Sequence, residues 1–376
     1  MPAAPLRVLH LCAGNLYGGV ERIVGECAAG RGLSPSMTPA FAVCFDGRLA
    51  DAIEATGARC ARLGAVRVSR PLTIWRARRQ LAQVLDTERC DAVICHSSWI
   101  TGLAAPVVRA HGAPLVLWAH DALSGRTWAE RWARRANPDF VIANSRFTDE
   151  RVRAVYPHTP HAVVYAPVSP APSAGDDRKA VRAALGADDT IPVVIVASRF
   201  EAWKGHRELI TALAAVRDPW RLWIAGRAQR DGEAAYERGL RERADAAGVT
   251  ARIQFLGERR DVPALMRAAD VHCQPNTGPE PFGLAFVEAL SAGLPVVTTA
   301  IGGACEIVTN DCGILVPPGA ARALEAALRR LVTDVATRRR LGAAGPARAS
   351  ALCDPARQLD ALASIAAAIP ARPVTT

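Results

Sequence analysis

The fold is decided by residues 193–205, which read Val-Val-Ile-Val-Ala-Ser-Arg-Phe-Glu-Ala-Trp-Lys-Gly. The first five residues are apolar and mostly β-branched, so they predict a short strand. The polar residues that follow predict a loop, and the amphipathic stretch over residues 205–217 predicts a helix. A strand that leads through a loop into a helix is the repeating unit of a parallel α/β sheet.

The same alternation of strand and helix runs along the whole chain. In the first half we expect strands at Arg7–Leu11, Ala40–Phe45, Ala92–Cys95, Pro114–Trp118, Phe140–Ile142 and Ala162–Val164, and helices near 20–31, 47–56, 72–87, 126–135 and 146–154. In the second half we expect further strands at Arg221–Ala225, Arg252–Leu256, Val271–Gln274, Pro295–Thr298 and Gly313–Val316, and further helices near 234–246, 262–268, 284–292 and 320–332. The pattern predicts an α/β protein of two Rossmann-like, doubly wound parallel-sheet domains that face each other across a cleft.

A proline-rich segment separates the two halves. Residues 167–172 read Pro-Val-Ser-Pro-Ala-Pro, and three prolines in six residues cannot lie inside a helix or a sheet. We therefore expect a first domain over 1–168, a linker over 169–190, a second domain over 191–354, and a C-terminal helix within 355–376 that joins the first domain. Ligands of such sheets bind at the carboxyl ends of the strands, so the loops that follow the strands are the places to search.

Composition and charge exclude several classes of protein. Hydrophobic residues make up 50% and charged residues 22% of the 376 residues, which excludes an extended disordered chain or a coiled coil. The net charge is +10, and residues 1–168 carry 20 basic and 13 acidic groups, a net +7. A basic half suits phosphates, nucleic acid or an anionic membrane surface. No basic run is organised around a groove-reading module, so we expect no nucleic-acid partner.

The cysteines and the apolar runs predict a cytoplasmic location. The ten cysteines lie mostly in apolar runs and form no Cys-x-x-Cys pair, so they are expected to be buried and reduced. The apolar run after Met1 is too short for a signal-peptide core. No uncharged stretch reaches the ~20 apolar residues that a membrane span requires.

Two loops after strands could bind phosphate. Arg199 and Lys204 follow the strand Val193–Ala197, and two fixed cations there could neutralise a diphosphate. Gly18 and Gly19 follow the first strand and open a helix, where backbone N–H groups can receive a phosphate. A tight turn explains this glycine pair as well. The spacing is not the G-x-G-x-x-G fingerprint, which counts against a dinucleotide oxidoreductase.

The strongest local signal lies at residues 279–290, which read Pro-Glu-Pro-Phe-Gly-Leu-Ala-Phe-Val-Glu-Ala-Leu. Glu280 precedes a helix that Gly283 helps to open, and Glu288 lies about one turn inside it on an apolar face. A carboxylate among apolar side chains is costly to bury without a hydrogen-bond donor, and sugar or ribose hydroxyls are such donors. The free N–H groups around Phe282–Leu284 could receive a phosphate at the same helix end.

Taken together, these residues resemble the retaining glycosyltransferases of family 4. The resemblance is carried by Arg199-x4-Lys204, Glu280-x7-Glu288, Gly293-Leu294-Pro295-Val296-Val297, Gly302-Gly303-Ala304-Cys305-Glu306-Ile307 and Gly313-Ile314-Leu315-Val316-Pro317-Pro318. It covers most of the chain and is densest from Val193 to Gly319. It implies the GT-B architecture, with the sugar donor in the C-terminal half and the acceptor mainly in the N-terminal half.

The resemblance also implies a role for each matching residue. Arg199 and Lys204 would hold the nucleotide diphosphate, Glu288 the ribose hydroxyls and Glu280 the hydroxyls of the donor sugar. Phe282, Gly283 and Leu284 would contribute backbone N–H groups, and Gly18 and Gly19 would close over the phosphate from the other domain. His120, which follows the strand Pro114–Trp118, would contact the donor sugar near the reacting carbon. The base would be contacted near Leu256 and Arg259.

The implied reaction is sugar transfer from a nucleotide diphosphate sugar, with UDP favoured over GDP, to a saccharide or lipid-linked acceptor in glycan, glycolipid, polysaccharide or lipopolysaccharide biosynthesis. The chain contains no Asp-x-Asp, so we expect neither a metal nor another cofactor. The family implies retention of configuration by front-face attack. The alternatives are a GT-B epimerase or hydrolase and a non-catalytic subunit that binds nucleotide sugars.

Two segments of the basic half combine arginine with tryptophan, at residues 75–79 and 126–135. On a helix, Trp128 and Trp132 would share one face, flanked by arginines. Such a helix can lie on an anionic bilayer, so we expect a cytoplasmic protein that docks on the inner face of the cell membrane. Tryptophans that pack in the domain core with arginines in water explain the pattern equally well.

Overall fold

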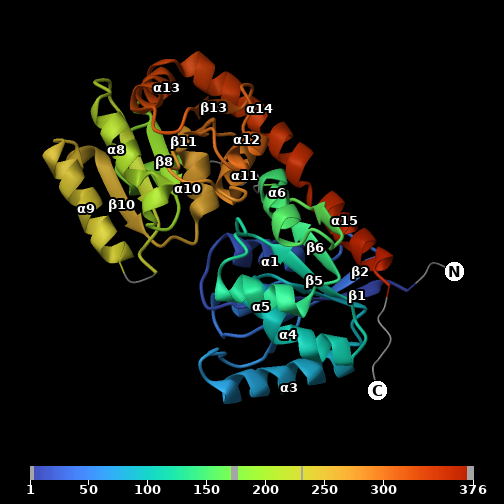
Figure 1. Cartoon of the computed structure of the whole chain (residues 1–376). Coiled ribbons are helices and arrows are strands. Elements are labelled where there is room, and N and C mark those ends of the chain that lie inside the picture. Colours follow the sequence, from blue (N-terminus) through green and yellow to red (C-terminus); the bar gives the residue numbers. More distant parts are fainter. Residues whose placement is uncertain (1–3, 171–176, 230–231, 371–376) are drawn as a thin grey trace. The chain divides into compact units, whose positions relative to one another are not determined.

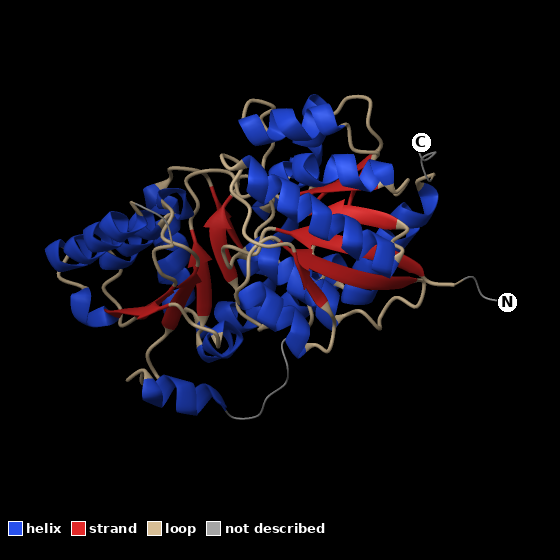
Figure 2. Ribbon diagram, turned by 90° about the horizontal axis from the view of Figure 1, so that it is seen from below, coloured by secondary structure: helices blue, strands red, loops and turns tan. Residues whose placement is uncertain are grey.

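The computed structural model describes residues 4–170, 177–229 and 232–370 of the chain (Figure 1). The chain divides into two compact units, which are Met1–Ser169 together with Cys353–Thr376, and Pro170–Leu352. We call them the N-terminal unit and the C-terminal unit. Helices cover both faces of each sheet (Figure 2).

The N-terminal unit is built on a seven-stranded parallel sheet in the order β3-β2-β1-β4-β5-β6-β7. Its strands are β1 (Leu6–Cys12), β2 (Met37–Val43), β3 (Cys60–Arg62), β4 (Ala92–Cys95), β5 (Leu115–Ala119), β6 (Phe140–Ala143) and β7 (His161–Val163). Its helices are α1 (Gly19–Ala29), α2 (Arg48–Ala55), α3 (Pro71–Glu88), α4 (Ser98–Ala110), α5 (Trp128–Ala136), α6 (Arg146–Val155) and α15 (Pro355–Ala368). The strand order reverses between β1 and β4, so the carboxyl ends of β1, β4 and β5 lie side by side.

Helix α15 belongs to the N-terminal unit although it is the last helix of the chain. It packs against α1, β1 and β2. Gln358 on α15 accepts a hydrogen bond from the backbone N–H of Tyr165, with Oε1 3.1 Å from the nitrogen. Asp354 caps the helix by accepting from the N–H of Arg357. Residues 371–376 of the expected C-terminal helix lie outside the described residues.

The C-terminal unit is built on a six-stranded parallel sheet in the order β10-β9-β8-β11-β12-β13. Its strands are β8 (Val193–Ala197), β9 (Arg221–Ala225), β10 (Ile253–Gly257), β11 (Val271–Gln274), β12 (Val296–Thr299) and β13 (Gly313–Val316). Its helices are α7 (Asp177–Ala184), α8 (His206–Ala214), α9 (Glu233–Ala246), α10 (Val262–Ala268), α11 (Leu284–Ser291), α12 (Ala304–Ile307), α13 (Ala321–Thr333) and α14 (Val335–Cys353), with short 3-10 turns at Ala202–Lys204 and Thr250–Arg252. Apolar strand residues such as Val194 and Leu222 are fully buried between the sheet and α8, α9 and α13.

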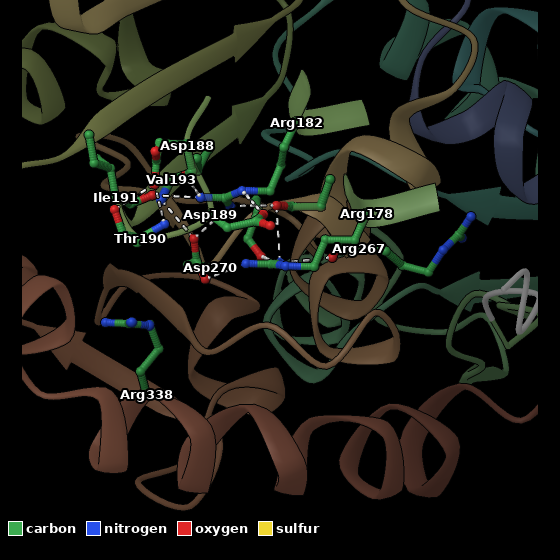
Figure 3. A network of polar contacts seen from close by, with 12 residues as sticks. Arg178, Arg182, Asp188, Asp189, Thr190, Ile191, Val193, Arg267, Asp270 and Arg338 are labelled. Carbon is green, nitrogen blue, oxygen red and sulfur yellow. Dashed lines mark hydrogen bonds and ion pairs between the residues drawn. The ribbon is translucent and has the colours of Figure 1, made fainter. Parts of the chain in front are cut away.

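The segment 169–190, which we expect to be a linker, is only partly one. Residues 171–176 lie outside the described residues, but Asp177–Ala184 forms helix α7, which packs against α10. Arg178 and Arg182 of α7 converge on the carboxylate of Asp270, at 2.8 and 3.0 Å (Figure 3). Arg182 is 1% exposed and also donates to the carbonyls of Ala268, Asp188 and Ile191. These contacts join α7 to the C-terminal unit, so that unit begins before residue 191.

Within the part of the chain that the structure describes, no helix combines the length and the apolar composition needed to cross a bilayer.

Candidate functional site

In the C-terminal unit, two loops at the carboxyl edge of the sheet are pressed together. One follows β8 and carries Arg199 and Lys204, and the other follows β11. Gly205 has a φ of +79°, and a Cβ atom there would lie 1.9 Å from the carbonyl oxygen of Pro275. The backbone N–H of Thr277 donates to the carbonyl of Trp203 at 2.8 Å. Only glycine at 205 allows this approach, which brings Lys204 to the second loop.

Glu280 is the centre of this contact. Its Oε2 atom accepts hydrogen bonds from Lys204 Nζ at 2.6 Å, Gln274 Nε2 at 3.1 Å and Asn276 Nδ2 at 3.3 Å. Its Oε1 atom accepts none from the described residues, and the side chain is 12% exposed. Three donors on one oxygen fix the orientation of the carboxylate and compensate for its burial. The second oxygen is left to accept a hydrogen bond from a ligand hydroxyl.

The segment after Glu280 is held by a glycine pair on the loop that follows β12. A Cβ atom at Gly302 would lie 2.3 Å from the carbonyl oxygen of Glu280, and one at Gly303 would lie 2.5 Å from that of Phe282. The N–H of Gly303 donates to the carbonyl of Glu280 at 2.8 Å. This packing buries Phe282 and fixes the start of α11.

Helix α11 begins beside Glu280. Gly283 precedes it with a φ of +112°, and a Cβ atom there would lie 2.3 Å from the ring of Phe286. The first N–H groups of a helix have no intrahelical acceptor, so Leu284 and the residues beside it can receive an anion. Glu288 lies one turn along the helix from Leu284, and both are half-buried. A ligand that binds near Glu280 could therefore also contact the N–H groups at the start of α11 and the carboxylate of Glu288, which lie along one face of the helix.

Among the described residues, Glu280 makes no hydrogen bond or ion pair with the other predicted residues of this unit. Arg199 pairs with Glu201, with Nη2 3.0 Å from Oε1. Arg259 forms a two-pronged pair with Asp261, at 2.8 and 2.6 Å, which lowers the pKa of that carboxyl and raises that of Arg259. Leu256 lies in the edge strand β10, which is separated from β8 by β9. The guanidinium of Arg259 is thus engaged by Asp261.

In the N-terminal unit, Gly18 and Gly19 open helix α1 after β1. The N–H of Gly18 donates to Oε2 of Glu21 at 3.0 Å, so this N–H is already paired. Neither glycine has a positive φ, and a Cβ atom at Gly19 would meet no atom within 4 Å. The packing of the fold does not require glycine at 19. The bare backbone is therefore available for close approach of a ligand.

His120 follows β5. It is the last of three buried histidines, His10, His96 and His120, whose ring nitrogens contact one another in series. Its Nε2 atom lies 3.0 Å from Nδ1 of His96, and Nε2 of His96 lies 3.0 Å from Nδ1 of His10. Burial lowers the pKa of His10 to about 4 and that of His120 to about 3, and it lowers the pKa of His96 well below the usual value. The three rings are therefore neutral at pH 7.

Several of these partners were not predicted from the sequence. His96 could have been predicted from its position, because it follows β4 just as His120 follows the neighbouring strand β5. Gln274 and Asn276 gave no comparable signal, because amides at a strand end are common. Within the described residues, no group of three or more His, Cys, Asp or Glu is arranged to hold a metal ion.

The two tryptophans of α5 have different surroundings. Trp128 is 53% exposed, whereas Trp132 packs against the α4 backbone at Gly102, where a Cβ atom would lie 2.4 Å from its ring. The two rings lie 6.2 Å apart, so Trp128 and Trp132 share one face of α5 as expected. Trp132 is partly buried and packs against the core, so Trp128 is the more exposed of the two. On α3, Leu72 is 71% and Trp75 is 58% exposed.

Comparison with known proteins identifies the family of the chain. Residues 177–348 match the family described as glycosyl transferases group 1, and residues 17–171 match the one described as glycosyltransferase family 4. The chain belongs to glycosyltransferase family 4. The two domains with parallel sheets match GT-B structures, so the expected fold class is confirmed.

Among solved structures, this family-4 chain is similar to Anabaena HepE in complex with UDP-glucose, with a TM-score of 0.82 and 25% identity over 96% of this chain and 100% of that one. A glycosyltransferase from Rickettsia africae has the same fold, with a TM-score of 0.82, 19% identity, and coverage of 98% of this chain and 99% of that one.

Curated relatives match over shorter regions. A phosphatidyl-myo-inositol mannosyltransferase of Mycobacterium leprae is 37% identical over 39% of this chain and 38% of its own length. A GDP-mannose-dependent monoacylated alpha-(1-6)-phosphatidylinositol monomannoside mannosyltransferase of Corynebacterium glutamicum is 33% identical over 48% of each chain. The chain thus spans less than half the length of these two relatives.

Proposed function

We propose that the chain transfers a sugar from a nucleotide diphosphate sugar to a saccharide or lipid-linked acceptor in glycan or glycolipid biosynthesis, with retention of configuration and without a metal ion. The observation that carries the proposal is the arrangement at Glu280, whose Oε2 receives three hydrogen bonds while Oε1 is left for a ligand. A partly buried carboxylate with one oriented oxygen that accepts no hydrogen bond from the described residues suits a sugar hydroxyl.

In the proposed reaction, fixed charges of the protein stabilise the nucleotide diphosphate as it leaves. The C1–O bond to phosphate breaks, and the nucleotide diphosphate leaves with the electron pair. Lys204 Nζ has three N–H donors, so it can neutralise the diphosphate while one donor stays on Glu280. Arg199 and the first N–H groups of α11 complete this stabilisation, which acts like an oxyanion hole. The acceptor hydroxyl bonds to C1 on the same face, and its proton goes to the departing phosphate.

We propose UDP as the nucleotide, with GDP as the competing possibility. Anabaena HepE, whose structure contains UDP-glucose, is similar to this chain over 96% of the length of this chain, and this similarity supports UDP as the nucleotide. The GDP-mannose-dependent relative of Corynebacterium glutamicum matches only 48% of this chain. Glu288 is proposed to bind the ribose hydroxyls, and Leu256 with Arg259 to lie near the base.

Replacement of Glu280 tests this proposal. Glu280→Gln removes the charge that Lys204 faces, and we expect turnover of the sugar nucleotide to fall by about 100-fold or more. Glu288→Gln should instead weaken nucleotide binding, since it would weaken the contact with ribose. Glu242→Gln is the matched control because Glu242 is exposed on α9.

The readout is the product formed from UDP-glucose or GDP-mannose with EDTA present. Full activity in Glu280→Gln would contradict the site. Equal nucleotide release with and without a sugar or lipid acceptor would favour a hydrolase, and binding without any turnover would favour a non-catalytic subunit.

We further propose that the N-terminal unit docks peripherally on the cytoplasmic, anionic face of the cell membrane through the start of α3. Exposed Leu72 and Trp75 stand there among the exposed arginines Arg70, Arg76 and Arg79. The variant Leu72→Ser with Trp75→Ser should lose binding to vesicles that contain phosphatidylglycerol. Leu33→Ser, at another exposed leucine, should retain it. Equal sedimentation of both variants would contradict the docking surface.

A further inference from the structure

Two buried amide side chains contact Glu280 in the C-terminal unit. Gln274 ends β11 and Asn276 follows in the next loop, and each is 1% exposed. Nε2 of Gln274 lies 3.1 Å and Nδ2 of Asn276 lies 3.3 Å from Oε2 of Glu280. Nε2 of Gln274 also donates to Oδ1 of Asn276 at 2.9 Å. The three side chains thus form a triangle of hydrogen bonds, and we call Gln274 and Asn276 the amide pair.

The backbone of the amide pair is fixed by the neighbouring strand β12. Gln274 pairs with Thr298 in the register of the two strands. Thr298 donates from Oγ1 to the carbonyl of Gln274 at 2.8 Å, and Thr299 donates in the same way to the carbonyl of Asn276 at 2.6 Å. Both threonines are buried. Buried amides on so constrained a backbone cannot change their places without repacking of the strand ends.

The charge of Glu280 determines which way each amide faces. Glu280 forms an ion pair with Lys204, and an ionised carboxylate only accepts hydrogen bonds. Asn276 must therefore turn its Nδ2 atom toward Glu280, and its Oδ1 atom then faces Gln274. Gln274 meets two acceptors, so it must present Nε2 to both. In the reverse orientation, Gln274 would place its oxygen against both acceptors and would bury an NH2 group without a partner.

This orientation leaves one buried atom unpaired. Oε1 of Gln274 has no hydrogen-bond partner among the described residues. A buried amide oxygen without a donor is unfavourable, and a methionine of similar length would fill the space without that atom. Packing therefore gives no reason for an amide at position 274, whereas the contact with Glu280 does.

Lys204 cannot provide the orientation of Glu280 by itself. In the proposed reaction its ammonium is also the group that neutralises the diphosphate, so an incoming nucleotide attracts it away from Glu280. The amide pair is buried and carries no charge, so the diphosphate does not attract it. Two of the three donors on Oε2 are therefore kept when the nucleotide binds.

We propose that Gln274 and Asn276 are positioning residues, which hold Glu280 by Oε2 so that Oε1 stays directed to a hydroxyl of the donor sugar. They act through Glu280 and need not contact the ligand. The inference rests on the proposed function for the identity of the ligand, whereas the orientation of the carboxylate follows from the hydrogen bonds alone.

Gln274→Met tests the proposal, because methionine has a similar length but no N–H group. We expect kcat for UDP-glucose to fall about tenfold, since a hydrogen bond to a charged group is lost, whereas Tm should change little. Gln254→Met, at a half-buried glutamine of β10, is the matched control and should leave kcat unchanged. Unchanged kcat in folded Gln274→Met would overturn the role of Gln274.

Gln274→Glu adds a readout that a purely structural role would not change. The protonated carboxyl can donate a hydrogen bond to Glu280, whereas the ionised carboxylate has no donor and repels Glu280, whose charge Lys204 only partly offsets. Relative to the unmodified protein, kcat of this variant should be largely retained at about pH 5.5 and should fall about tenfold by about pH 8.5. In the control Gln254→Glu the ratio should stay constant. A ratio for Gln274→Glu that does not depend on pH would overturn the positioning role.

Nitrogen NMR of the unmodified full chain without ligand tests the orientation independently of turnover. The side-chain NH2 group of Gln274, assigned through its backbone, should exchange slowly with solvent at pH 7, because it donates to two acceptors and is buried. Rapid exchange would overturn the proposal, even where a variant fails to fold. If the unmodified protein turns over no sugar nucleotide while this group is protected, the proposed function fails and the orientation of Glu280 stands.

Discussion

The two units share one architecture, but the polar groups that follow their strands interact in different ways. The N-terminal unit places neutral imidazoles side by side, and each depends on its neighbour for a hydrogen bond. The C-terminal unit instead sets opposite charges against each other: Glu280 faces Lys204, and Asp270 faces Arg178 and Arg182. A neutral row can orient a hydroxyl without attracting charge, whereas fixed ion pairs suit a site that receives a diphosphate. The comparison predicts that the units respond differently to acid and to loss of single groups.

Acid should produce the largest difference. Burial lowers the pKa of His10 to about 4 and of His120 to about 3, with His96 also lowered, and it lowers those of His206 and His272 in the C-terminal unit to about 3. Between these values and 6.5 only the unfolded chain binds the protons, so stability is complete above pH 6.5 and falls as pH decreases. Three histidines correspond to a loss of up to about 4 kcal/mol per pH unit in the N-terminal unit.

Hydrogen exchange at pH 7 and pH 5, corrected for intrinsic rates, should show this loss first in β1 and β4 and less in β9 and β11. Greater loss of protection in the C-terminal unit would contradict the comparison.

Removal of the charge at Asp270 should have the next largest effect. Asp270→Ala leaves Arg182, which is 1% exposed, without its carboxylate, and we expect a cost of about 3 kcal/mol. Hydrogen exchange of β8 and β11 measures the effect, because the N–H of Val193 also donates to Asp270 at 2.8 Å. Asp218→Ala, at an exposed position of the same unit, should change little. Unaltered protection in Asp270→Ala would show that the pair does not stabilise α7.

A glycine in each unit should also respond differently to substitution. Gly205→Ala combines a φ of +79° with a clash against Pro275, so we expect about 2 kcal/mol of destabilisation and displacement of Lys204. Gly19→Ala has neither problem, so it should keep its melting temperature and lose affinity for UDP-glucose. Calorimetric melting and titration measure both quantities. A large drop in the melting temperature of Gly19→Ala would assign that glycine to the fold alone.

The smallest effect is expected at His272. Neither ring nitrogen has a hydrogen-bond partner among the described residues, and the ring lies against Phe286 in the core. His272→Leu removes two unpaired polar atoms, so it should be neutral or stabilising by up to about 1 kcal/mol. Chemical denaturation measures the change. A clear destabilisation would mean that the ring contributes packing that leucine cannot replace.

Much of the fold was predictable because buried parallel strands appear as short apolar runs. Val193–Ala197 is such a run, and it forms β8 with the same bounds. Strand β3 was missed because three residues at a sheet edge carry no period. Helix α4 was missed because it is buried almost throughout and lacks a polar face. Helix α14 was also missed. It contains Gly342, and glycine is unfavourable inside a helix, but it is required here because a Cβ atom would clash with the carbonyl oxygen of Gly293.

The candidate site was predictable in its residue types but not in its pairings. Arg199, Lys204 and Glu280 could be selected because charged residues followed strands. The contact between Lys204 and Glu280 joins residues that are far apart in sequence, and it depends on the fit of Gly205 against Pro275. Arg259 pairs with the nearby carboxylate of Asp261, and this pairing competes with binding of a ligand by Arg259. The spacing of charged residues in the sequence does not show which of them are paired in this way.

The most direct test of the central claim is a thermal-shift measurement on the unmodified protein and on Lys204→Ala, with UDP, UDP-glucose, GDP-mannose and NAD, without divalent metal. A ligand at 100 times its Kd stabilises the folded state by about 2.7 kcal/mol, so binding raises Tm. We predict a selective rise with UDP-glucose in the unmodified protein that is lost in Lys204→Ala. No rise with any sugar nucleotide, or a rise with NAD alone, would contradict the account.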